Sequence, residues 1–466
     1  MGGPVYRFDN SWHSQWIQAV GTPKKSGTCP YYQFSFNAVI VELLNRGQGG
    51  RQMRIFSRYE TLSVVAAVTL VLGVFVPDAE LKKIIFGIGI FWFIASSLAR
   101  KFSRQAHAHE DLADAFDDDG LIAKMPATLL SYYREKLIGS GYSIYRAGGE
   151  EFPILTMESW IPSPAEHPNG IFPTLELPDK KSRAFKTSAL GDIYIAAAKE
   201  KGQFFEKNDI YALEEIGAVG DNGDVMLQVE ISDYEKFVRS SQVLNAELLL
   251  HLKHRSEGGN FFSKFLANKR FGSDLRDSIV VGDFKNYACK IGLNVLTVER
   301  NIDSDRFFVM DRGHRNSKRP LEYPNAIHVV PAGTIQPQTL GRKSNSYDGP
   351  EDLLITNTLY REFAEEMFED EVMHQDRLMQ SVESGEVKFV VTGMGIDAAS
   401  QKFEISALLI TPDGYMAGFK SSESEGRNKV VNRDELTKYA TNVTKIIPAG
   451  AMAIFQGLRY LDSISR

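Results

Sequence analysis

Two uncharged apolar runs near the start of the chain constrain its fold more than any other feature. The first spans residues 61–77 (TLSVVAAVTLVLGVFVP) and the second spans residues 84–98 (IIFGIGIFWFIASSL), with a short charged linker between them. Neither run keeps the polar stripe of a helix that packs on a soluble core, so a buried helical hairpin is the weaker interpretation. The pattern predicts a two-helix transmembrane hairpin at residues 59–100, although each run is shorter than the ~20 residues of a comfortable span.

Basic residues flank this hairpin on its two outer sides. Four arginines precede it and three basic residues follow it: Arg46, Arg51, Arg54, Arg58, Arg100, Lys101 and Arg104. Because Lys and Arg concentrate on the cytoplasmic side of membrane proteins, both termini are predicted to be cytoplasmic.

Length and composition limit what else the chain contains. A chain of 466 residues is expected to hold two or three folded units. Its formal net charge of -6 argues against general nucleic-acid binding. Cys29 and Cys289 are the only cysteines, so neither a disulfide framework nor a four-thiolate zinc site is expected. The predicted segments are an N-terminal cytoplasmic segment (1–58), the hairpin (59–100), a helical stalk (101–140), an intermediate α+β region (141–285) and a final domain (286–466).

The final domain shows alternating short strands and helices. Strands are expected at residues 293–299, 306–310, 326–333, 387–396 and 403–410, and helices at residues 352–368 and 447–461. This β-β-β-α-β-β-α order predicts an α+β layered domain.

Three carboxylates on the first of these helices are the strongest candidate for chemistry. Glu362, Glu365 and Glu366 stand at positions i, i+3 and i+4, so they share one helix face. Clustered carboxylates repel one another, which suits a site for Mg²⁺ or Mn²⁺. Such an ion binds diphosphates and activates water, so these residues are the candidate metal ligands and, in an enzyme, the candidate catalytic residues.

Basic residues gather in two nearby loops. The loop after residue 310 and the polar stretch after residue 333 carry Arg312, Arg315, Lys318, Arg319, Arg342 and Lys343. These residues are candidate ligands for phosphate groups, and ordinary solvated loops are the alternative.

The string Arg361-Glu362-Phe363-Ala364-Glu365-Glu366, preceded by Pro331-Ala332-Gly333, resembles the core motif of the Nudix family. The resemblance covers residues 286–466 and implies an α/β/α sandwich for them. Phe368 stands where the family pattern has a glycine, and Tyr347 and Leu353 stand where it has a glycine and a glutamate. These departures favour a nucleotide-sensing domain over an active hydrolase.

A membrane hairpin joined to such a domain resembles the SMODS-associated Nudix effectors of cyclic-oligonucleotide antiphage systems. The resemblance implies a multi-pass protein of the bacterial inner membrane. It also implies a cyclic nucleotide second messenger as partner, homo-oligomerisation on activation, and contact with membrane lipid that ends in membrane disruption. The alternatives are a membrane-tethered Nudix hydrolase of nucleoside diphosphate derivatives and a structural membrane protein with an inactive Nudix fold.

Overall fold

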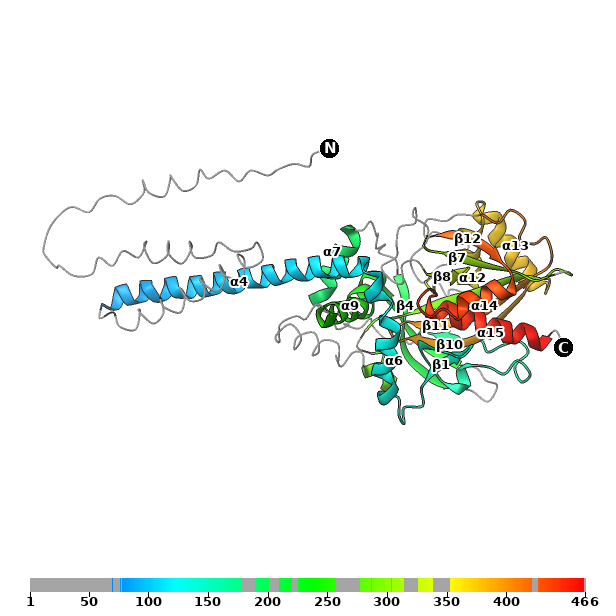
Figure 1. Cartoon of the computed structure of the whole chain (residues 1–466), viewed down its shortest axis with the longest axis horizontal. Coiled ribbons are helices and arrows are strands. Elements are labelled where there is room, and N and C mark those ends of the chain that lie inside the picture. The colour runs from blue at the N-terminus through cyan, green and yellow to red at the C-terminus, as the bar shows by residue number, and fades with distance from the viewer. Residues whose placement is uncertain are drawn as a thin grey trace. The chain divides into compact units, whose positions relative to one another are not determined.

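The computed structural model describes most of the chain after residue 77. The described residues are 69, 76, 78–177, 189–200, 209–219, 225–256, 277–285, 287–302, 304–313, 326–337, 353–420 and 426–464. The chain divides into two compact units, residues 1–102 and 103–466. The long helix α4 (Ala79–Asp117) begins in the first unit, and the sheet belongs to the second (Figure 1).

The predicted transmembrane hairpin is wrong. No helix among the described residues is both long enough and apolar enough to cross a membrane. The apolar run 84–98 is shorter than the ~20 residues a span needs. It continues within α4 into the charged sequence RKFSRQAHAHEDLADAFD. The multi-pass inner-membrane localisation, which rested on the hairpin, is wrong for the same reason. Of the first apolar run, only residues 69 and 76 lie among the described residues.

The fold is mixed α/β rather than the predicted α+β with a membrane hairpin. Its 12-stranded sheet contains parallel and antiparallel pairs, β11 running parallel to β6 and β3 parallel to β5. The main path is β1 (Ser143–Ala147), β2 (Glu150–Thr156), β10 (Lys388–Asp397), β11 (Phe403–Thr411), β6 (Cys289–Glu299), β4 (Asp209–Val219), β5 (Val225–Asp233) and β3 (Thr174–Glu176). Off this path lie β7 (Arg306–Asp311), β8 (Ile327–Val329), β9 (Ala332–Thr334) and β12 (Arg427–Val431). Strands from before and after residue 286 therefore join in one sheet.

Helices cover both faces of this sheet. Successive residues of β6 point to opposite faces, so Leu293 and Val295 join one hydrophobic cluster while Leu296 and Val298 join another. The first cluster includes α12 (Ile355–Met367), and the second includes α15 (Pro448–Ile464). The sheet thus carries α12 and α15 on opposite sides.

Seven further helices complete the described part of the fold. They are α5 (Asp119–Ile122), α6 (Met125–Lys136), α7 (Ala189–Glu200), α8 (Tyr234–Phe237), α9 (Val243–Ser256), α13 (Glu371–Glu383) and α14 (Arg433–Ala440). A π-helical turn, η2 (Val238–Gln242), joins α8 to α9, and short 3-10 turns lie at Glu158–Trp160 and Ile279–Val281. The side chains of Asp370 and Asn432 accept backbone N–H groups of the first turns of α13 and α14, which explains where these helices begin.

Candidate functional site

The acidic helix α12 is fixed to the sheet by an apolar stripe. Leu359, Phe363 and Met367 recur every four residues and are essentially fully buried in the first hydrophobic cluster. This anchoring orients the adjoining face, so Glu362 and Glu366 are each only 9% exposed. The side chain of Glu365 is 42% exposed and is the carboxylate of the three that faces solvent most.

Arg361 holds two of these carboxylates together. Its Nη2 lies 2.7 Å from Glu362 Oε1 and donates to the carbonyl of Thr334 at 3.0 Å. Its Nη1 lies 3.3 Å from Glu365 Oε2, a longer and weaker contact. Burial disfavours the charged guanidinium, but Glu362 and Glu365 outweigh that effect and raise the pKa of Arg361 above its ordinary value.

Strand β9 lies directly against the acidic face of α12. The backbone N–H of Ala332 donates to Glu366 Oε2 at 2.8 Å. At the next residue, a Cβ added to Gly333 would overlap the carboxylate of Glu362. Only glycine therefore lets the backbone of β9 approach this carboxylate so closely. The two sequence features quoted for the Nudix resemblance, residues 331–333 and 361–366, are in contact.

The C-terminal end of α12 is held by the segment around β12. Lys420 Nζ donates to the carbonyl of Glu365, and Asn428 Nδ2 donates to the carbonyl of Glu366 at 2.9 Å. Phe368 follows the helix in an extended conformation with φ -138° and packs its ring against Phe363. A helix that ends in this way needs no left-handed residue, which explains why Phe368 can occupy a position where the family pattern has glycine.

The carboxylates do not form a closed metal cage. Among the described residues, no three His, Cys, Asp or Glu side chains are grouped closely enough to hold a metal ion. Glu362 contacts Arg361 through Oε1, Glu365 contacts Arg361 through Oε2, and Glu366 accepts the N–H of Ala332 through Oε2. Mg²⁺ commonly binds through one or two carboxylates together with the phosphates of a ligand and several waters. The donor set therefore fits an ion that arrives with a phosphate ligand better than an ion held by protein alone.

Of the six predicted phosphate ligands, only Arg312 lies among the described residues. It is half-buried at the end of β7, and its backbone N–H donates to the carbonyl of Ala326 at 3.0 Å. The charge of Arg312 also acts on His328: the pKa of this buried histidine lies well below its ordinary value, first because of burial and then because of the charges of Arg312 and Lys402. The other five, Arg315, Lys318, Arg319, Arg342 and Lys343, lie outside the described residues.

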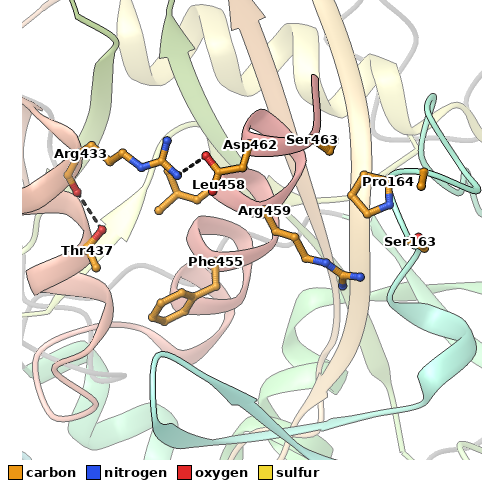
Figure 2. A pocket seen from close by; sticks show the side chains of 10 residues that line it. Ser163, Pro164, Arg433, Thr437, Phe455, Leu458, Arg459, Asp462 and Ser463 are labelled. Carbon is orange, nitrogen blue, oxygen red and sulfur yellow. Dashed lines mark hydrogen bonds and ion pairs between the residues drawn. The ribbon is translucent and has the colours of Figure 1, made fainter. Parts of the chain in front are cut away.

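A separate groove, missed by the sequence analysis, lies between α14, α15 and the segment Ser163–Ala165. Its volume is about 570 Å³. Arg433 Nη2 lies 2.6 Å from Asp462 Oδ1, and Arg459 extends toward Pro164 (Figure 2). The groove combines residues about 300 positions apart, so no local pattern could have shown it. Because it mixes a carboxylate with two guanidinium groups, one of them already paired, its charge selects no particular ligand.

Comparison with models of known protein families gives no match for this sequence, and comparison with curated proteins gives none either. Function is therefore inferred from the geometry of the site.

Proposed function

We propose that the face formed by α12 and β9 binds a nucleotide through its phosphate groups, with Mg²⁺ or Mn²⁺ between phosphate and protein. The observation that carries the proposal is the close approach of Gly333 to Glu362, together with the hydrogen bond from Ala332 to Glu366, which places the backbone of β9 against two of the three carboxylates. Glu365 is the residue that reaches the ion, because its side chain is the most exposed of the three and its contact with Arg361 is the longest. The ion neutralises the carboxylates and attracts the anionic ligand to them.

Binding without turnover fits the contacts better than hydrolysis. Glu362 is paired with Arg361 at 2.7 Å, and Glu366 accepts the N–H of Ala332 at 2.8 Å. A carboxylate that acts as a general base must reach the proton it removes, and these two are turned toward the protein. They position the backbone around the ligand. A cyclic nucleotide is the ligand class implied by the resemblance in the sequence, and the proposal includes self-association of the chain when this ligand binds.

The test is equilibrium binding by calorimetry on the full chain, with cyclic dinucleotides and nucleoside diphosphate derivatives, in Mg²⁺ and again in EDTA. We expect one of these ligands to bind in Mg²⁺ and at least tenfold more weakly in EDTA. Glu365→Gln should cause a similar loss, because it removes the charged oxygen that meets the ion. Glu369→Gln is the matched control, since Glu369 is an exposed carboxylate just beyond the same helix.

Two outcomes decide against this proposal. Binding that is equally tight in EDTA and in Glu365→Gln would remove the cation and Glu365 from the site. Rapid Mg²⁺-dependent cleavage of a nucleoside diphosphate derivative, lost in Glu365→Gln, would instead establish the hydrolase. A rise in oligomer size on ligand addition, followed by light scattering, tests the self-association.

A further inference from the structure

A second cavity lies between helices α6 and α9, within the unit formed by residues 103–466. Its volume is about 540 Å³. It is lined by Lys124, Ala127, Thr128, Ser131, Tyr132, His251, Leu252 and Arg255. This volume falls within the range of about 300–1,000 Å³ that is typical of small-molecule sites.

Helical spacing explains why polar groups from both helices meet in this cavity. Lys124, Thr128 and Ser131 follow one another by four and three residues, so they share one face at the start of α6. On α9, His251 and Arg255 are four residues apart and also share a face. His251 is only 8% exposed, so the cavity has a buried polar side chain in its wall, while Lys124 and Arg255 are exposed at its edge.

The charge of the cavity wall has one sign. None of its eight lining residues is acidic, whereas Lys124 and Arg255 are cationic. One carboxylate touches the wall from behind: Asp277 accepts the hydroxyl of the lining residue Tyr132, and Lys136 pairs with it and offsets its charge. Asp114 pairs with Lys253 at 3.2 Å, and neither of these two residues lines the cavity. Within the described part of the chain, neither Lys124 nor Arg255 is in an ion pair.

We infer that this cavity binds a small organic molecule that carries a phosphate group. Arg255 supplies a planar fork of N–H donors that matches two phosphate oxygens, and Lys124 supplies a compact charge on the other helix. The hydroxyl of Ser131 adds a neutral donor. The cavity's volume leaves room for an organic group beside the apolar side chains of Ala127 and Leu252. This site is independent of the carboxylate site on α12, because it attracts an anion without a metal ion.

The experiment is binding of the four ribonucleoside 5′-monophosphates and of inorganic phosphate to the full chain by calorimetry. EDTA is present throughout, so the cation-dependent site on α12 does not contribute. We expect at least one monophosphate to bind, and to bind at least tenfold more tightly than both its nucleoside and inorganic phosphate. Lys124→Gln and Arg255→Gln should each weaken this binding at least fivefold, because each removes one charged donor.

Lys438→Gln is the matched control. It removes the same charge from an exposed position of α14, away from the cavity, and should leave the binding unchanged. Unfolding midpoints of all three variants should match the parent, since substitutions of exposed side chains change stability little. The inference is overturned if no monophosphate binds at millimolar concentration, if binding survives in the Lys124→Gln/Arg255→Gln double variant, or if Lys438→Gln weakens it equally. Binding of inorganic phosphate as tight as that of the best monophosphate would overturn the organic part of the inference.

Discussion

Replacing Gly333 by alanine should destabilise the protein through one identifiable clash. The added Cβ would overlap the carboxylate of Glu362, which is buried and has little space to withdraw. Overpacking of this kind costs about 1–3 kcal/mol. Alanine restricts the unfolded chain more than glycine does, which offsets about 0.4–1 kcal/mol. Arg361 keeps its contacts with Glu365 and Thr334, so the larger cost of an isolated buried charge is not reached. The expected net loss is about 1–2 kcal/mol.

Urea unfolding of the full chain and of three variants (Gly333→Ala, Glu362→Ala and the double variant) tests this reasoning. Gly333→Ala is compared with the parent, and the same substitution is then made in a Glu362→Ala background. Once the carboxylate is absent, Gly333→Ala should cost no more than about 0.5 kcal/mol, the usual error of additivity. If the substitution costs the same in both backgrounds, the clash with Glu362 is not its cause. A change smaller than about 0.5 kcal/mol in the parent background would refute the predicted contact altogether.

Three buried titratable groups give further predictions. Burial raises the pKa of the Cys289 thiol, so in a Cys29→Ser variant the remaining thiol should react with a disulfide reagent at pH 8 only after unfolding in urea. Burial also raises the pKa of Glu404, although Lys402 opposes it, so the folded state keeps a proton that the unfolded state releases. Stability should therefore fall as pH rises above about 4.5, and Glu404→Gln should lose this dependence in urea midpoints measured from pH 4 to 8. Burial lowers the pKa of His328, so the stability that this neutral side chain contributes to the fold should be lost as pH falls below 6.5. If the urea midpoints of His328→Asn follow the same pH profile as those of the parent, this prediction is wrong.

The elements around the acidic helix could be predicted because their signals are local. The mostly apolar segment 293–299, which lies within β6, and the four-residue stripe of α12 predicted the types of these elements correctly. The run at residues 326–333 was predicted as one strand, but it changes partner: β8 pairs with β7, and β9 pairs with β6. Pro331, which lacks an N–H, lies at the change, and its carbonyl accepts the N–H of Val295 at 3.0 Å. Partner choice is a long-range property, so the contact of Gly333 with Glu362 could not be derived from the run itself.

The predicted membrane span was wrong and the cavity between α6 and α9 was missed because both depend on residues beyond the local segment. Apolar residues in the run 84–98 predicted a membrane span, but the run is part of a 39-residue helix whose later residues are charged. The cavity between α6 and α9 was missed because its two walls lie more than 100 positions apart in the sequence. The basic residues of each helix alone predict no site, and only the packing of α6 against α9 shows that Lys124 and Arg255 line one cavity.

Salt should weaken binding at the two proposed sites to different extents, because the sites attract phosphate by different means. The chain carries a formal net charge of -6, so an anion must be attracted by local groups. Lys124 and Arg255 are exposed, so their attraction should weaken when salt shortens the screening length from about 10 Å at 0.1 M to about 3 Å at 1 M. At α12 the ligand is coordinated by an ion that contacts partly buried carboxylates, and such contacts are screened much less. Raising NaCl from 0.1 to 1 M should therefore weaken monophosphate binding in EDTA severalfold more than nucleotide binding in Mg²⁺. Equal losses in both titrations would show that the two ligands are bound by the same exposed charges, and the assignment of a metal-linked site to α12 would then fail.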